Sequence, residues 1–172
     1  MKTLGAVRNL CLALSVTFAA GLLFVNVYNS VVDAPNWGHS LPASMEAARS
    51  YYSAANPGNF FRVVSPLNQV FALLSLLLCW KASPRVRLFC GLALVVTVSL
   101  DVLTFGYFYP RNAIMFTSPI TDLDAIRLAY AQWTAMNWVR SAGIALNLGF
   151  AFAALCGLFS LDRRAQDVLD PA

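Results

Sequence analysis

The chain has 172 residues, of which 59% are hydrophobic and only 12% are charged, with a net charge of +4. Soluble domains carry about 25% charged residues, so this composition excludes an ordinary water-soluble protein. The basic residues are spread over several loops and form no single stripe, which argues against a nucleic-acid partner.

Four long apolar runs predict the fold. We place spans at about residues 7–28, 63–80, 88–109 and 137–161, each close to the ~20 residues that cross a bilayer as a helix. The runs do not alternate with period two, which excludes a transmembrane β-barrel. The sequence therefore predicts an all-α, polytopic membrane protein of one domain. Its four-helix transmembrane bundle should carry a helical cap formed by the loop after the first span.

The distribution of positive charge predicts how the bundle is oriented. The first span follows Lys2 and Arg8, as a signal peptide would, but its apolar part is too long for one, so we expect a retained helix. Short basic segments favour the cytoplasmic side. One end holds Lys2, Arg8, Lys81, Arg85, Arg87, Arg163 and Arg164, and the other holds Arg49, Arg62, Arg111, Arg127 and Arg140. This predicts a multi-pass protein of the inner (cytoplasmic) membrane with both termini cytoplasmic.

The segment of residues 29–62 is long for a connection between two spans and carries a predicted helix of its own. That helix begins near Pro42, since proline is tolerated in a first turn, and ends at the Asn-Pro-Gly that follows. Two interpretations stay open: a cap anchored at headgroup level by aromatic residues, or a lid over a site. As a lid, the segment would offer Trp37 and Tyr52 to a ligand. His39, the only histidine, would then act as an acid or base; otherwise it is an interfacial loop residue.

Polar residues interrupt the second and third spans near their outer ends. Asn68 lies within membrane reach, where an amide needs a partner. Thr97, Asp101 and Thr104 recur at helical spacing and form a narrow polar stripe on one face. Asp101 is the only acid inside an apolar run, and it lies ~12 Å below the outer end of its helix.

The fourth span opens with a polar face. Asn137, Arg140 and Asn147 recur at spacings that place them on one side of a helix. An arginine near the centre of a spanning helix costs roughly 2.5–3.5 kcal/mol, so Arg140 needs a partner or a wet cavity. By depth Asp101 falls between Arg140 and Asn147, which predicts that Asp101 and Arg140 meet in a polar pocket. The pair is either a structural ion pair or part of a ligand site. The sequence also leaves open whether the helical segment from Thr121 is continuous with this span.

Three short motifs resemble a known family. They are residues 60–68 at the start of the second span, Tyr109-Pro110-Arg111-Asn112 after the third, and residues 133–141 at the start of the fourth. In order and helix count the chain resembles the anthrone oxygenase-like family of small four-helix membrane proteins, most of whose bacterial members are uncharacterised. The resemblance implies oxidation of a lipophilic aromatic substrate with no bound metal or flavin as cofactor. The chain departs from the family in having a single histidine, in a loop.

Two functions are compatible with these features. The first is an oxidoreductase, a cofactor-independent oxygenase, acting in a polar pocket in the outer half of the bilayer. Its catalytic candidates are Asp101, Arg140 and His39. The second is a non-catalytic accessory or assembly subunit of a larger membrane complex. The predicted partners are the lipid bilayer and either a lipophilic small molecule or other membrane subunits, with a possible oligomer. The substrate-binding candidates are Asn68, Asn137, Trp138, Asn147, Trp37 and Tyr52.

Overall fold

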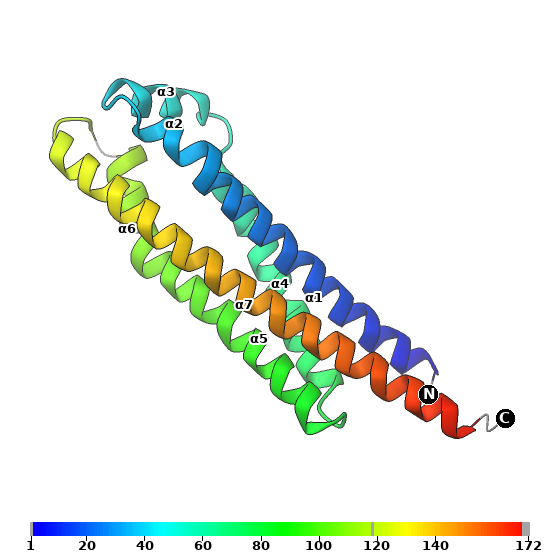
Figure 1. The fold of residues 1–172 in the computed structure, drawn as a ribbon. Coiled ribbons are helices and arrows are strands. Elements are labelled where there is room, and N and C mark those ends of the chain that lie inside the picture. The colour runs from blue at the N-terminus through cyan, green and yellow to red at the C-terminus, as the bar shows by residue number, and fades with distance from the viewer. Residues whose placement is uncertain (1, 118, 170–172) are drawn as a thin grey trace.

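The structure, a computed structural model, describes residues 2–117 and 119–169. Within those ranges every regular element is helical and none is a strand. Four helical segments are long and apolar enough to cross a membrane: Leu4–Gly38, Pro57–Leu78, Pro84–Thr117 and Leu123–Leu161. The predicted all-α, four-helix transmembrane bundle is confirmed (Figure 1).

The first segment is longer than its predicted span of residues 7–28. Helix α1 (Lys2–Tyr28) passes through a π-helical segment, η1 (Asn29–Asp33), directly into α2 (Ala34–Gly38). Hydrocarbon thickness limits the length of a helix only where lipid covers it, so the predicted span ends too early. Here the additional turns are covered by protein, since Ala34 is fully buried.

The last segment, α7 (Leu123–Leu169), is one uninterrupted helix of 47 residues. It begins where the side chain of Asp122 accepts a hydrogen bond from the backbone N–H of Ala125 at 2.9 Å. No glycine or proline occurs between Thr121 and Ala142, so nothing in the backbone favours a break before the span. The segment from Thr121 is therefore continuous with the predicted span.

The middle pair of helices begins with side-chain caps. The side chain of Asn56 accepts a hydrogen bond from Gly58 N at the start of α4 (Pro57–Leu78), and proline occupies the first helical position. Ser83 caps α5 (Pro84–Leu103) in the same way. Helix α4 thus begins about two turns before the predicted position 63, because its start is set by this cap and not by hydropathy.

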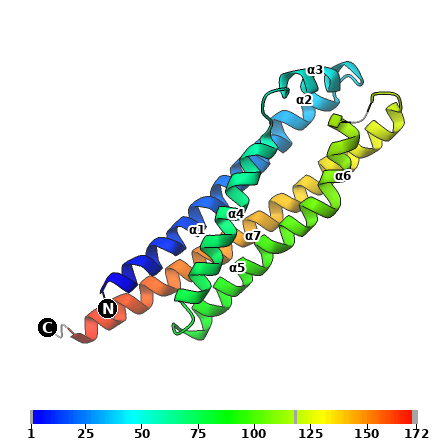
Figure 2. The ribbon, with the colours of Figure 1, turned by 180° about the vertical axis from the view of Figure 1, so that it is seen from behind.

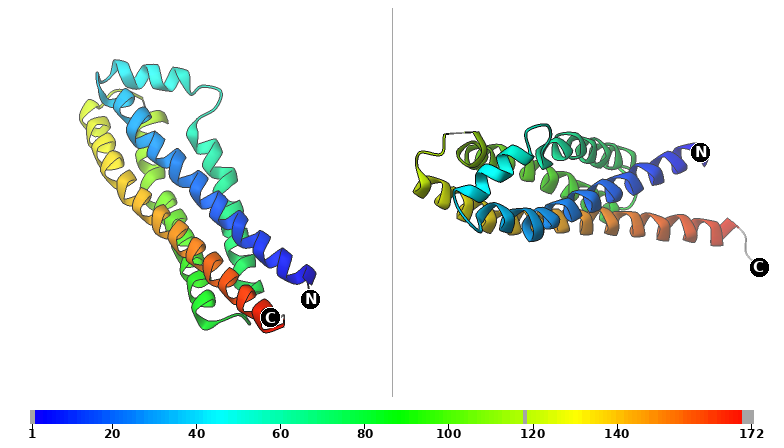
Figure 3. Two further views of the ribbon diagram at one scale, coloured as in Figure 1. Left: turned by 45° about the vertical axis from the view of Figure 1, so that its right-hand side comes forward. Right: turned by 90° about the horizontal axis from the view of Figure 1, so that it is seen from above.

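The third segment changes its winding where it leaves the apolar run. Beyond α5 the chain continues through η2 (Thr104–Phe108), α6 (Tyr109–Asn112) and η3 (Ala113–Thr117) without a turn. The short helix α3 (Ala43–Tyr51) lies across this end of the bundle with α2, forming the predicted cap (Figure 3). We call this the cap end, and the opposite end, where α1 begins and α7 ends, the terminal end.

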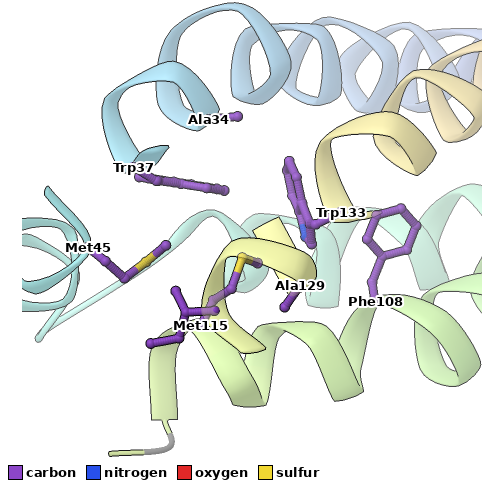
Figure 4. Packing of buried hydrophobic residues seen from close by; sticks show 8 residues of the cluster. Ala34, Trp37, Met45, Phe108, Met115, Ala129 and Trp133 are labelled. Carbon is purple, nitrogen blue, oxygen red and sulfur yellow. The ribbon is translucent and has the colours of Figure 1, made fainter. Parts of the chain in front are cut away.

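Helix α7 lies at the centre of the packing. It packs against α5 and α1, and α4 packs against α1 and α5 (Figure 2). At the cap end a buried cluster, the cap core, joins α2, α3, η2, η3 and α7 (Figure 4). In it the ring centroids of Trp37 and Trp133 lie 5.1 Å apart in a T-shaped arrangement. The cap core consists of Ala34, Trp37, Met45, Phe108, Met115, Ile126, Ala129 and Trp133.

Candidate functional site

The elements α5, η2, α6 and η3 form one continuous helical rod, which we call the α5–η3 rod. A cavity of about 570 Å³ lies at the cap end between α4, this rod and α7. All four spans and the cap contribute to its wall. Four charged residues belong to that wall, namely Arg49, Arg62, Asp101 and Arg140. A mainly apolar cavity with a few convergent polar groups is the usual form of a small-molecule site.

Beside the cavity, four buried polar residues join α1 and η1 to α7, and we call them the polar clasp. Asn26 Nδ2 donates to the backbone oxygen of Asn137 at 3.2 Å, and Asn137 Nδ2 donates to that of Asn26 at 3.3 Å. The same two amides also donate to Ser141 Oγ at 2.7 Å and to Ser30 Oγ at 2.6 Å. Because these groups are buried at membrane depth, the clasp fixes how α1 and α7 are rotated against each other.

The polar clasp also holds Arg140. The Nε of Arg140 donates to Asn26 Oδ1 at 2.7 Å, and the residue is only 8% exposed. Its guanidinium carbon lies 4.3 Å from the ring centroid of Phe108 and 5.0 Å from that of Phe61. Ring faces attract the cation but accept no conventional hydrogen bond, so four of the five N–H donors of Arg140 have no partner among the described residues.

Asp101 lies in the wall of the same cavity as Arg140, but the two do not form the ion pair that was one of the two predicted alternatives. Among the described residues the two are not joined by an ion pair. The Nε2 of Gln69 donates to Asp101 Oδ2 instead. The physical reason is that each charged group has a neutral amide closer at hand, from α1 for Arg140 and from α4 for Asp101. The cavity wall therefore holds a carboxylate and a guanidinium that are not in contact with each other.

Two asparagines predicted to bind substrate have different surroundings. Asn147 belongs to the cavity wall and is 1% exposed, yet its Oδ1 has no hydrogen-bond partner. Asn68 is fully buried outside the wall, where its Nδ2 donates to Thr97 Oγ1 at 2.9 Å. The Oδ1 of Asn68 also lacks a hydrogen-bond partner, so what distinguishes Asn147 is its place in the cavity wall, where a ligand can reach its amide.

The exposed residues of the cavity wall lie in two rows, one on α4 and one on the α5–η3 rod, and we infer that the cavity opens sideways through a slot between them. Wall residues that are also exposed lie along both edges of this slot. Those on the rod recur every four residues and so share one face. The edge on the rod consists of Phe105, Tyr109, Ala113 and Thr117, and the edge on α4 includes Arg62 and Pro66. In a membrane this slot would face the surrounding lipid or its headgroups.

Of the predicted aromatic residues, two line the cavity and one does not. Trp37 and Tyr52 belong to the wall, with ring centroids 6.2 Å apart. Burial and then the nearby Asp33 carboxylate raise the pKa of Tyr52 to about 12, so its hydroxyl stays protonated and can donate a hydrogen bond. Trp138 is 49% exposed on the outward face of α7 and lies outside the wall.

Two further predicted site residues also lie outside the wall. His39 is exposed in the turn after α2, with its ring Nδ1 3.0 Å from the backbone oxygen of Asn36. Asn137 is buried in the polar clasp, so its amide is used between helices. The structure therefore brings together Asp101, Arg140, Asn147, Trp37 and Tyr52, and separates from them His39, Asn68, Asn137 and Trp138.

Sequence reasoning missed the role of Arg49. Its Nε donates to the backbone oxygen of Met115 at 2.8 Å and its Nη2 to that of Ile114 at 3.3 Å. These carbonyls are at the end of a helical rod, where cations are favoured. Arg49 thus ties α3 to η3 and closes the cavity on the cap side. A basic residue in the predicted cap helix was the available signal, but its partner is remote in sequence.

Within the described ranges, no three His, Cys, Asp or Glu side chains gather closely enough to hold a metal ion. Comparison of the chain with protein-family models, with curated proteins and with solved structures finds no match. The cavity and its wall therefore carry the functional argument.

Proposed function

We propose that this membrane protein is an oxidoreductase that binds a lipophilic aromatic compound in the cavity and oxidises it with O2. Three features support the proposal. The slot faces the lipid, where such a compound dissolves, and Trp37 and Trp133 offer aromatic faces inside the cavity. The third feature carries the most weight: Asp101 and Arg140 share the cavity without pairing.

Unpaired groups of opposite charge suit proton abstraction beside a carbonyl. In an anthrone the methylene hydrogens are acidic, because the charge left on carbon is delocalised onto the carbonyl oxygen. Asp101 accepts the proton as general base, while Arg140 and Asn147 donate hydrogen bonds to the oxygen that gains charge. The carbon then transfers electrons to O2. Overall the methylene becomes a carbonyl, one oxygen atom enters the product, and the other leaves as water with both hydrogens.

The resemblance to the anthrone oxygenase-like family supports the same substrate class. It rests on short motifs, one of which spans residues 133–141 and contains Arg140 itself. His39 has no part in this proposal, since it lies outside the cavity wall.

A turnover assay tests the proposal. The protein is placed in lipid nanodiscs with anthrone and O2, and anthraquinone is followed by absorbance against empty nanodiscs, which report spontaneous oxidation. Removing a general base with Asp101→Asn should lower the rate by about 10²-fold. Asp124→Asn is the matched control, because Asp124 is an exposed acid paired only with Arg127. Wild-type nanodiscs that react no faster than empty ones contradict the proposal and leave the accessory-subunit interpretation.

We further propose that the terminal end faces the cytoplasm, in the inner membrane. The turn between α4 and α5 carries the basic residues Lys81, Arg85 and Arg87 close to the ends of both helices. Short loops with this composition remain on the cytoplasmic side.

A further inference from the structure

The charges in the cavity wall are unequal. Three of the four charged residues in the wall are arginines, against the single carboxylate of Asp101. Two of the arginines are accounted for. Arg49 is held by the carbonyls of η3, and Arg62 lies exposed at the slot, where water and headgroups can solvate it. The remaining positive charge, on Arg140, is the buried one.

Among the residues that the structure describes, Arg140 has no counter-ion at contact distance. Its Nε binds a neutral amide, and its terminal nitrogens, Nη1 and Nη2, make no hydrogen bond to a described residue. The rings of Phe61 and Phe108 lie over the guanidinium and keep water from its faces. A buried, unpaired charge is costly, whereas the same charge with a hydrogen-bonded anion is much less so. The terminal N–H groups therefore favour an anion within the cavity.

The neighbouring groups indicate which kind of anion fits. Asn147 lies in the same wall as Arg140, two turns further along the same face of α7, so its amide Nδ2 supplies a second N–H donor to the cavity. Aromatic side chains surround the remaining space, among them Trp37, Phe61 and Trp133. Such a wall suits a flat ring whose own oxygen carries the charge. The unpaired charge of Arg140 is buried, whereas Arg62 at the outer edge is exposed to water, so the buried donors favour a ligand that enters the cavity over a phospholipid headgroup held at the slot.

We propose that the ligand binds as an aryl oxyanion, a phenolate or enolate, whose charged oxygen is held by Arg140 and Asn147. This rests on the proposed function, because it assigns the ionisation state that the substrate holds in the same cavity once Asp101 has accepted its proton. The site then selects for lipophilic compounds that are acidic at oxygen over neutral analogues of the same shape. Charge-assisted hydrogen bonds from a guanidinium supply that selectivity.

A chromogenic probe tests the proposal directly. A lipophilic nitrophenol absorbs in the visible range only as its phenolate, so its ionisation can be read while it is bound to the protein in nanodiscs. Binding should lower the apparent pKa of the probe by about one pH unit relative to empty nanodiscs, and the phenolate should bind roughly tenfold more tightly than the methyl ether of the same probe. Arg140→Gln should abolish both effects.

Two further variants keep the test decisive. Arg140→Lys retains the charge, so it should keep part of the preference for the phenolate even if Arg140→Gln folds poorly. Arg62→Gln should leave the preference in place, because Arg62 lies at the slot.

Equal binding of the phenol and its methyl ether overturns the oxyanion proposal while the proposed binding of aromatic compounds stands. A preference that is lost in Arg62→Gln and kept in Arg140→Gln also overturns it. Binding of neither probe overturns both proposals.

Discussion

The two halves of the bundle are built from the same four helices but are held together differently. At the terminal end a buried apolar cluster forms the core, in which Ala154 and Leu158 of α7 pack against Leu12, Cys79, Val86 and Cys90. At the cap end the polar clasp, Arg140 and the cap core surround a cavity. Lipid is as apolar as leucine, so helices gain little from apolar contact alone and depend on close packing or hydrogen bonds. The terminal half depends on close packing. The cap half depends on hydrogen bonds, which leaves room for a ligand at the cap end.

The largest expected effect concerns which end faces out. Replacing the native cysteines and introducing Ser53→Cys in the loop after α3 should give a protein that reacts fully with an impermeant maleimide on intact cells. Arg85→Cys, in the basic turn at the other end, should stay unlabelled until the membrane is opened. The opposite labelling pattern would mean that the bundle is inverted.

The next effect breaks the cap half at the polar clasp. Asn137→Leu removes two amide hydrogen bonds and leaves buried groups on Asn26 and Ser30 without their donor. We expect a loss of about 2–3 kcal/mol in the free energy of unfolding, measured as thermal stability in detergent.

The matched control for this prediction is Asn147→Leu on the same helix face. Its amide oxygen has no partner to lose, so the substitution should leave stability unchanged or raise it, while ligand binding is lost. Similar losses of stability in both variants would show that the clasp is not what holds this half.

A smaller effect tests the terminal half. Ala154 is fully buried between α7 and the apolar core of that end. Ala154→Leu adds volume where the helices are already in contact, so we expect a loss of about 1–3 kcal/mol with ligand binding retained. Ala145→Leu, at an exposed position of α7, provides the comparison and should be neutral. A tolerated Ala154→Leu would indicate that the terminal half has free volume too.

The smallest effect separates the two neighbours of Arg140. A double-mutant cycle on unfolding that pairs Arg140→Gln with Asn26→Ala should give a coupling of about 1 kcal/mol, because the two side chains share a hydrogen bond. The cycle that pairs Arg140→Gln with Asp101→Asn should give less, since these groups are not in contact. A larger coupling to Asp101 would favour the structural ion pair, which is one of the two alternatives that the sequence leaves open.

Much of the fold was accessible from the sequence because the bilayer imposes strong constraints. Hydropathy located all four spans, and the three- and four-residue spacing correctly placed Arg140 and Asn147 on one face. Proline and asparagine also marked the helix within the cap. These signals are local, and each follows from the geometry of a single helix.

The partners across helices were not accessible. Asn26 offered no local sign that it would bind Arg140, since its direction depends on how α1 is rotated against α7. Trp138 was predicted to bind substrate, yet it is two residues before Arg140 of the cavity wall, and two residues along a helix turn the side chain by ~200°, to the outward face of α7. Contacts between distant segments need the relative rotation of helices, which hydropathy does not supply.

The π-helical segments have a consequence for how this chain can vary. Hydrogen bonds in a π turn join residues five apart instead of four, so each such segment holds about one residue more than an α turn. Deleting a single residue from Asn29–Asp33 would convert this segment into an ordinary α turn and leave the helix beyond it in nearly the same phase, since a five-residue π turn and a four-residue α turn each complete about one turn. Trp37 would then keep its place in the cap core and the cavity wall. The same deletion within the α-helical part of this span would instead rotate Trp37 by ~100° about the helix axis, so the π-helical segment is where the span can lose a residue without dismantling the site.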